Sequence, residues 1–199
     1  MRERVNILDV SSAHPDFMGF IFYKNSPRYV GADFSIPDDL DVNIQRIGVF
    51  VNEEVGAILD LVLKHRLDFV QLHGDESPAQ CKELMEKGIG VIKVFSVDDD
   101  FDFTVVDQYQ SEVDYFLFDT KGKARGGNGV AFNWSLLENY KGAIPYFLSG
   151  GIDPENVNEV IGLKHEQLFA IDVNSGIERA PGSKDVSKLN LLIKNYVGR

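Results

Sequence analysis

The sequence is short of cysteine, of basic residues and of long apolar runs. Its 199 residues include one cysteine, Cys81, so no internal disulfide can form and a reducing compartment is expected. No apolar run reaches the roughly 18–20 residues that a membrane-spanning helix needs. Residues 1–6 carry no apolar stretch of the kind found in a secretory signal. We therefore expect a cytoplasmic protein with no membrane partner.

The shortage of basic residues also limits the partners. Twenty lysines and arginines stand against 31 aspartates and glutamates, which gives a formal net charge of −11. Nonspecific binding to nucleic acid needs a positive surface, so we expect no nucleic-acid partner. A small anionic ligand is still compatible with this charge, because a few backbone N–H groups can bind a phosphate locally.

What is present is typical of one folded domain spanning residues 1–199. Apolar residues make up 44% of the chain and charged residues 26%, and no linker rich in proline, glycine or serine divides it. Short, nearly continuous apolar runs are typical of strands buried on both faces of a parallel sheet. The predicted strands are residues 17–22, 47–51, 69–72, 91–95, 115–118, 146–148 and 169–173.

Helical patterns lie between these runs. They cover residues 5–12, 52–63, 78–87, 153–162 and 185–196, and a further helix is expected within 98–113. Asn52 is a candidate N-cap for the second helix and Ser77 for the third. Repeated strand–helix units predict an α/β fold, and the length fits a (β/α)8 TIM barrel. Only seven strands are found and a helix comes first, so we expect a barrel domain that lacks its first β-strand.

Two glycine-containing loops follow the last two predicted strands. Gly150 and Gly151 precede a helix, and Ser175 and Gly176 follow the final strand. Each loop alone could be an ordinary tight turn. The loops after the last two strands are, however, the usual phosphate site of (β/α) barrels. The pair therefore favours a phosphate site.

Polar residues at other strand ends are candidates for chemistry. Asp119 follows a buried strand, where desolvation would raise its pKa toward that of a general acid, although an isolated aspartate at such a position more often opens a turn. Gln71 and His73 end another strand, and a single histidine is more often structural. Arg28 could clamp a carboxylate or lie on the surface. The glycine-rich loop 121–129 could be a lid or simply a flexible loop.

Other kinds of chemistry find no support. The histidines show no spacing typical of metal ligands, so no metal is predicted. Cys81 falls within a predicted helix and is interpreted as a packing residue. GxSxG, Walker A and post-strand GxGxxG motifs are absent.

Together these clusters resemble phosphoribosylanthranilate isomerase over nearly the whole chain. The similar segments, in order, are GFIFYKNSPRYV, IGVFVNE, FVQLHGDE, FDTKGKARGGNG, FLSGGIDPENV and DVNSGIERAPGSKD. The resemblance implies a cofactor-free Amadori rearrangement of a small phosphoribosyl substrate in tryptophan biosynthesis. It assigns the general acid to Asp119, the anthranilate carboxylate to Arg28, and the phosphate to Gly150, Gly151, Ser175 and Gly176. It places Gln71, His73 and Asp172 at the active face.

One departure from the family bears on activity. The family's general base is a cysteine in a Lys-x-Cys-Gly segment that ends the first strand, and this sequence has no such segment. Cys81 lies in a different unit and cannot replace it. We therefore expect weak or absent isomerase activity. The open barrel edge could be covered by self-association or by pairing of residues 1–5.

Two other functions remain open on the sequence alone. One is a phosphosugar-binding remnant without activity. The other is a different phosphate-binding barrel enzyme such as indoleglycerol-phosphate synthase, whose catalytic lysine–glutamate arrangement and longer N-terminal extension are not evident in the sequence.

Overall fold

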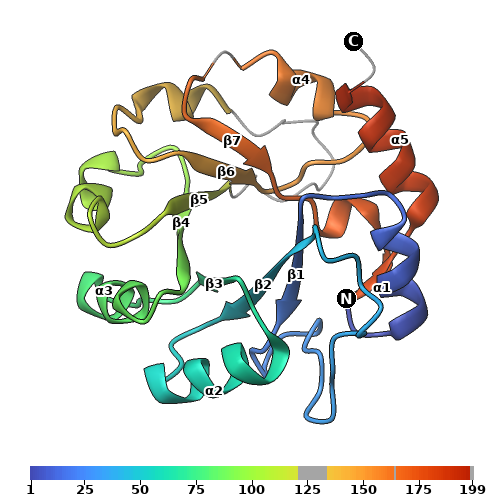
Figure 1. Ribbon diagram of the computed structural model, residues 1–199. Coiled ribbons are helices and arrows are strands. Elements are labelled where there is room, and N and C mark those ends of the chain that lie inside the picture. Colours follow the sequence, from blue (N-terminus) through green and yellow to red (C-terminus); the bar gives the residue numbers. More distant parts are fainter. Residues whose placement is uncertain (121–133, 164, 198–199) are drawn as a thin grey trace.

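The computed structural model describes residues 1–120, 134–163 and 165–197, and they form a curled parallel sheet with helices on its outside (Figure 1). The sheet contains seven strands in sequential order, each hydrogen-bonded in parallel to the next. They are β1 (Phe17–Ile21), β2 (Gln45–Phe50), β3 (Phe69–Leu72), β4 (Gly90–Val97), β5 (Tyr115–Thr120), β6 (Tyr146–Ser149) and β7 (Leu168–Ile171). The seven predicted strands are confirmed, with ends that differ by a few residues.

Five of the six predicted helical segments contain an α-helix, and α2, α3 and α4 are shorter than the sequence pattern indicates. The α-helices are α1 (Arg4–Ser11), α2 (Val55–His65), α3 (Pro78–Glu86), α4 (Val157–Ile161) and α5 (Val186–Val197). The 3₁₀ helices are η1 (Phe103–Tyr109), η2 (Trp134–Asn139) and η3 (Ser175–Ile177). A short hairpin of β8 (Glu178–Ala180) and β9 (Ser183–Lys184), which the sequence pattern did not predict, precedes α5.

Three local predictions are wrong. Asn52 does not cap α2: its φ is 50°, its side chain accepts a hydrogen bond from the N–H of Asp75 at 2.6 Å, and Glu54 occupies the N-cap position. Residues 98–113 form only η1, where the β-branched Thr104, Val105 and Val106 disfavour a regular α-helix. The helix expected over 153–162 is reduced to α4. Asp153 accepts hydrogen bonds from the N–H groups of Glu155 and Asn156 and so holds the residues just before α4 in a turn.

The apolar core has two layers on either side of the sheet. The larger cluster packs strand residues such as Phe116 and Phe118 against residues of the helices, including Ile58, Leu84 and Val157. The smaller cluster lies on the concave face and draws its buried members from strands alone. These members are Ile47, Ile92, Val94, Leu117 and Phe147. Because successive strand residues point to opposite faces, near-continuous apolar runs supply both layers.

The sheet is open between its first and last strands. Among the described residues β1 pairs only with β2 and β7 only with β6. Helices α1 and α5 contact each other and lie on this open side (Figure 1). Residues 1–3 precede α1 and form no strand, so pairing of residues 1–5 across the opening is not found.

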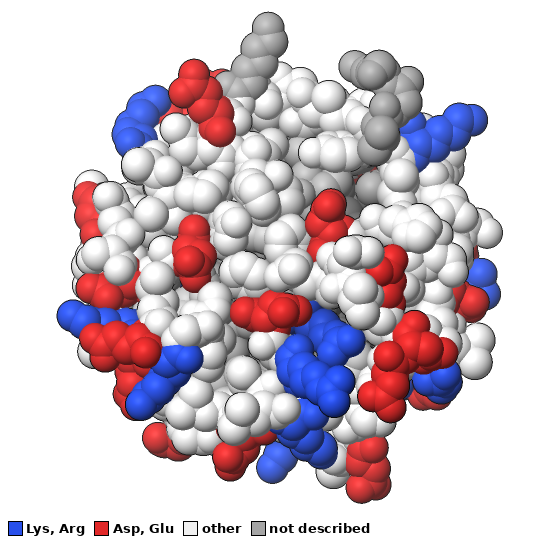
Figure 2. Space-filling model, viewed as in Figure 1, with Lys and Arg blue, Asp and Glu red and all other residues white. Residues whose placement is uncertain are grey.

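The surface carries charges of both signs. On the face shown in Figure 2, the basic side chains at the lower centre lie among acidic ones. No helix of the described residues has the length and apolar character required to cross a membrane.

The start of α3 provides a first test of the local interactions. Ser77 accepts a hydrogen bond from the N–H of Gln80, and the Gln80 side chain accepts one from the N–H of Ser77, which forms a capping box. We expect Ser77→Ala to lower the free energy of unfolding by about 1 kcal/mol, since the Gln80 N–H then keeps only its hydrogen bond to the Ser77 carbonyl oxygen. Urea denaturation measures the change. Ser77→Thr retains the hydroxyl and should stay near the native value; equal losses in both variants would refute the capping role.

Candidate active site

One cavity of about 690 Å³ extends from the carboxyl ends of the strands through the inside of the sheet to its open side, where residues of α1 and α5 also line it. All nine residues that the sequence singled out as site residues line it. They are Arg28, Gln71, His73, Asp119, Gly150, Gly151, Asp172, Ser175 and Gly176. Parallel strands bring these residues together, because each predicted site residue lies at the carboxyl end of its strand or in the loop that follows. The structure thus places them in one site, while their individual roles stay predictions.

Asp119 and His73 face each other and both line the cavity. Asp119 lies in β5 and His73 follows β3, and His73 Nε2 is 3.6 Å from Asp119 Oδ2. Both side chains remain about one-third exposed, at 35% for His73 and 29% for Asp119. The buried Gln71 places its Nε2 3.4 Å from Nδ1 of His73. A carboxyl group therefore reaches the cavity beside an imidazole whose other nitrogen faces an amide.

Asp172 is a second carboxyl group in the cavity. It comes directly after β7, and its Oδ2 accepts a hydrogen bond from Ser149 Oγ at 3.0 Å. Burial raises the pKa of Asp172, while the Ser149 hydrogen bond and the charge of Lys184 act in the opposite direction. The negative charge of Asp119 adds to the upward shift. Two carboxyl groups thus share one partly enclosed space, which favours protonation of one of them.

This shift gives a pH-dependent prediction for stability. A carboxyl group with a raised folded-state pKa binds its proton more tightly when folded. Its stabilising contribution is complete below the ordinary value of 3.8 and is lost as pH rises through the folded-state pKa. We therefore expect Asp172→Asn to be more stable than the native chain at pH 7, with the difference vanishing below pH 3.8. Urea denaturation across this range measures it.

The exposed Asp60 of α2 offers the matched control. Asp60→Asn should show no such pH-dependent gain. A native chain that is more stable than Asp172→Asn at pH 7 would contradict the electrostatic interpretation.

The two glycine loops meet where they line the cavity. Gly150 and Gly151 have φ values of 101° and 66°, a left-handed conformation that favours glycine. Gly176 packs directly against the carbonyl oxygen of Ile152, where a Cβ atom would clash. The loops after β6 and β7 therefore pack against each other through their backbones.

Arg28 is not a free surface residue. Its Nη2 lies 2.7 Å from Glu178 Oε2, and its Nε donates to both carboxylate oxygens at 3.0 Å. Glu178 also accepts from Lys184 Nζ at 3.3 Å and from the N–H of Gly182 at 2.9 Å. Burial opposes ionisation of Glu178, but these hydrogen bonds and charges outweigh it and keep its pKa below the usual value.

Glu178 and Lys184 are site residues that the sequence reasoning missed. Lys184 lines the cavity and also donates to the carbonyl oxygen of Asn174 at 2.9 Å, just before the second glycine loop. The sequence around Glu178 matches no pattern that would mark it as a site residue. Its partner Arg28 is 150 positions away, and the sequence pattern contains no information about this pairing.

Other residues that the sequence singled out do not enter the site. Cys81 is fully buried in α3 within the larger core cluster, so its interpretation as a packing residue is confirmed. Burial raises the pKa of its thiol to about 11, so near neutral pH the group stays protonated and holds no thiolate to act as a base. The loop 121–129 lies outside the described residues. Within the parts of the chain that the structure describes, no group of three or more metal-ligating side chains is found.

The seven-stranded curled parallel sheet and the polar residues at the carboxyl ends of its strands define a protein of the (β/α)-barrel class. The family model described as N-(5'phosphoribosyl)anthranilate (PRA) isomerase matches residues 2–195. The chain belongs to this family.

Relatives and solved structures agree with this assignment. N-(5'-phosphoribosyl)anthranilate isomerase of Parabacteroides distasonis is 40% identical over 99% of this chain and 89% of its own length. The enzyme of Phocaeicola vulgatus is 44% identical over 97% of this chain and 93% of its own length. The crystal structure of phosphoribosyl anthranilate isomerase from Thermotoga maritima covers 100% of this chain and 96% of its own, with a TM-score of 0.85 and 36% identity.

A further similar crystal structure contains a ligand. It is phosphoribosyl anthranilate isomerase in complex with reduced 1-(o-carboxyphenylamino)-1-deoxyribulose 5-phosphate. This structure has a TM-score of 0.83 and 34% identity, and the match covers 100% of this chain and 96% of that one.

Proposed function

We propose that this chain isomerises N-(5'-phosphoribosyl)anthranilate to 1-(2-carboxyphenylamino)-1-deoxyribulose 5-phosphate, a step of tryptophan biosynthesis. Family membership supports the reaction class. The observation that carries the proposal is that Asp119, Arg28 and both glycine loops line one cavity. That arrangement offers a proton donor between groups suited to the two anionic ends of the substrate.

Asp119 is the proposed general acid. Its proton passes to the furanose ring oxygen as the bond between this oxygen and C1′ breaks, which gives an imine. A base then removes the C2′ proton of the protonated imine to give a neutral enolamine. Protonation of this enolamine at C1′ and loss of the proton of its 2′-hydroxyl give the ketone. His73, whose Nε2 is 3.6 Å from Asp119 Oδ2, is placed to stabilise the carboxylate left after proton donation.

The two ends of the substrate have separate proposed partners. Backbone N–H groups of the loops at Gly150–Gly151 and Ser175–Gly176 bind the phosphate. Arg28 binds the anthranilate carboxylate through the guanidinium donors that Glu178 does not use. Glu178 thereby fixes the plane of the guanidinium, and Lys184 offsets the charge of the shared carboxylate.

The proposed site contains no cysteine thiol to serve as the base that removes the C2′ proton. The single cysteine of the sequence, Cys81, is buried in α3 and does not line the cavity. The second carboxyl group of the cavity is Asp172, and a carboxylate is a weaker base than a thiolate. We therefore expect the 199-residue chain to bind its substrate and to turn it over slowly. This same observation favours the second candidate, a phosphosugar-binding protein without turnover.

Binding of the reduced product analogue tests the proposed site without requiring turnover. Isothermal titration should show one molecule bound per chain, with inorganic phosphate as a competitor. Arg28→Lys keeps the charge but loses the planar fork, and we expect a roughly 10-fold weaker affinity for the analogue. Affinity for inorganic phosphate alone should be unchanged in this variant. Failure of the native chain to bind the analogue would contradict the proposed function.

The open side of the sheet between β1 and β7 offers a surface for self-association. We propose that copies of this chain associate through the open side of the sheet, where Phe169 is 49% and Tyr196 38% exposed. A structure similar to this chain is described as monomers made from a dimeric phosphoribosylanthranilate isomerase. Sedimentation of the native chain and of Phe169→Ser tests this: the variant should dissociate at concentrations where the native chain is dimeric.

We also propose a cytoplasmic location, supported by the single cysteine.

A further inference from the structure

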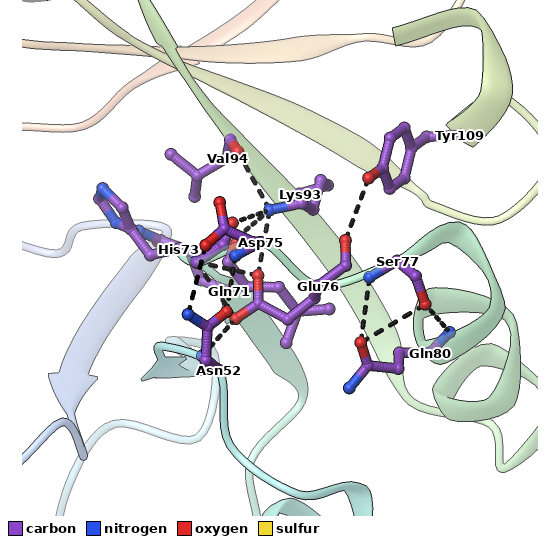
Figure 3. A network of polar contacts seen from close by, with 12 residues as sticks. Asn52, Gln71, His73, Asp75, Glu76, Ser77, Gln80, Lys93, Val94 and Tyr109 are labelled. Atoms are coloured by element: carbon purple, nitrogen blue, oxygen red, sulfur yellow. Dashed lines mark hydrogen bonds and ion pairs between the residues drawn. The ribbon is translucent and has the colours of Figure 1, made fainter. Parts of the chain in front are cut away.

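A buried ion pair lies behind His73, on the side of the sheet away from the cavity. Lys93 in β4 places its Nζ 3.0 Å from Oε2 of Glu76, which follows β3. The two side chains are 3% and 1% exposed. Figure 3 shows the Lys93 ammonium at the centre of the network, with His73 and Asn52 to one side and Tyr109 to the other. Neither charged residue lines the cavity.

The pair holds the backbone on both sides of His73. Lys93 Nζ donates to the carbonyl oxygen of Leu72 at 3.2 Å and to that of Gly74 at 2.7 Å. Glu76 accepts from the N–H of Gly74, at 3.1 Å through Oε1 and 2.9 Å through Oε2. The residue before His73 and the residue after it are thus both bonded to the same ion pair.

A second loop is fixed to the same carboxylate. The N–H of Asn52 donates to Glu76 Oε1 at 2.8 Å, and Asn52 Oδ1 accepts from the N–H of Asp75 at 2.6 Å. A Cβ atom at Gly74 would clash with the Asn52 side chain. The loops after β2 and β3 are therefore locked together by the carboxylate of Glu76.

Stability alone does not explain such a pair. Removing two charges from water is costly, and apolar side chains of similar volume stabilise a fold as well or better. The hydrogen bonds of this pair are instead directed to backbone groups that flank His73. These contacts fix the backbone immediately before and after His73.

We propose that Glu76 and Lys93 are positioning residues that hold the His73 imidazole toward Asp119. The inference rests on the proposed function of Asp119 as the acid. Gln71 Nε2 faces Nδ1 of His73 at 3.4 Å, which makes Nδ1 the acceptor and places the ring proton on Nε2, toward Asp119. The pair acts only through the backbone of residues 72–74, so it is distinct from the groups that contact substrate.

The test reads the His73 ring directly in the ligand-free protein. Nitrogen-15 NMR of the imidazole distinguishes the two neutral tautomers. In the native chain we expect Nε2 to carry the proton, with a single set of ring signals. In Glu76→Gln an amide NH₂ replaces one oxygen and faces either a backbone N–H or the Lys93 ammonium. We expect both tautomers in this variant and at least 10-fold faster hydrogen exchange at the Gly74 amide.

Tyr109→Phe is the matched control. Tyr109 donates to the carbonyl oxygen of Glu76 at 3.1 Å, so this variant removes a buried hydrogen bond beside the pair but keeps both charges. Its ring signals should match those of the native chain. Lys93→Met removes the ammonium with little change in volume, and should reproduce the Glu76→Gln signals; where it does not fold, Glu76→Gln decides.

Native ring signals in a folded Glu76→Gln protein would overturn the inference and leave the pair a purely structural role. Because no substrate is present, this outcome is separate from failure of the proposed function, which appears as loss of analogue binding in the native chain. Turnover adds a second readout: kcat of Glu76→Gln should fall about 10-fold while KM stays within twofold.

Discussion

Asp119→Asn should lower kcat by about 10²- to 10⁴-fold, the range by which a positioned general acid accelerates a reaction. The amide occupies the same space and accepts hydrogen bonds, but it has no proton to give to the ring oxygen. The imine therefore does not form at a useful rate, while the phosphate loops and Arg28 are untouched. KM and affinity for the reduced product analogue should stay within a few-fold. The rate of loss of anthranilate fluorescence measures the change.

The control for this variant lies at the other end of the same strand. Asp114 immediately precedes β5, and its carboxylate accepts a hydrogen bond from the N–H of Val91 at 2.8 Å. Asp114→Asn removes the same charge and keeps an acceptor oxygen, so kcat should be native. Equal turnover in Asp119→Asn and the native chain would remove Asp119 from the mechanism.

Gly176→Ala should weaken binding of the reduced product analogue and of inorganic phosphate by about 10- to 100-fold. The added methyl group meets the carbonyl oxygen of Ile152, so the loops after β6 and β7 must separate. Separation moves the backbone N–H groups away from the phosphate, and a lost hydrogen bond to a charged group amounts to about 1.5–3 kcal/mol. Strain should also lower the free energy of unfolding by about 1–3 kcal/mol. Isothermal titration and urea denaturation measure the two effects.

Gly56→Ala provides the comparison for this prediction. Gly56 lies within α2, and a Cβ atom there meets no neighbouring atom. The substitution should leave phosphate affinity unchanged and stabilise the helix by up to about 1 kcal/mol. Native phosphate affinity in Gly176→Ala would show that the phosphate binds elsewhere.

The strands could be predicted from the sequence because their pattern depends on burial alone. Runs such as 115–118 are apolar throughout, which indicates a strand covered on both faces. In the structure, alternate residues of this run lie in the two core layers: Phe116 and Phe118 in the larger, Leu117 in the smaller. The cavity-lining set followed from the same reasoning, since parallel strands bring the residues after them to one edge. Motif order then indicated the family.

What could not be predicted depends on contacts between distant residues. Asparagine is a residue type that often caps helices, but the side chain of Asn52 instead accepts a hydrogen bond from the N–H of Asp75 in the loop after β3. The pairing of Arg28 with Glu178 joins residues 150 positions apart. Lys93 lies within an apolar run as the one charged residue of β4, and only the fold shows that Glu76 neutralises it.

The 3₁₀ helix η1 shows a different limit. Its apolar spacing fits an α-helix, yet Asp102 accepts a hydrogen bond from the N–H of Thr104 at 2.9 Å and starts a tighter turn. Local side-chain to backbone bonds of this kind compete with regular helix formation. Periodicity alone does not reveal which alternative prevails.

The most direct test of the proposed activity is the rate at which the 199-residue chain removes the fluorescence of N-(5'-phosphoribosyl)anthranilate. We predict a slow rate that rises in proportion to chain concentration and is inhibited by the reduced product analogue. Fluorescence loss at the uncatalysed rate, in a chain that still binds the analogue, would contradict catalysis by this chain and identify it as a phosphosugar-binding protein.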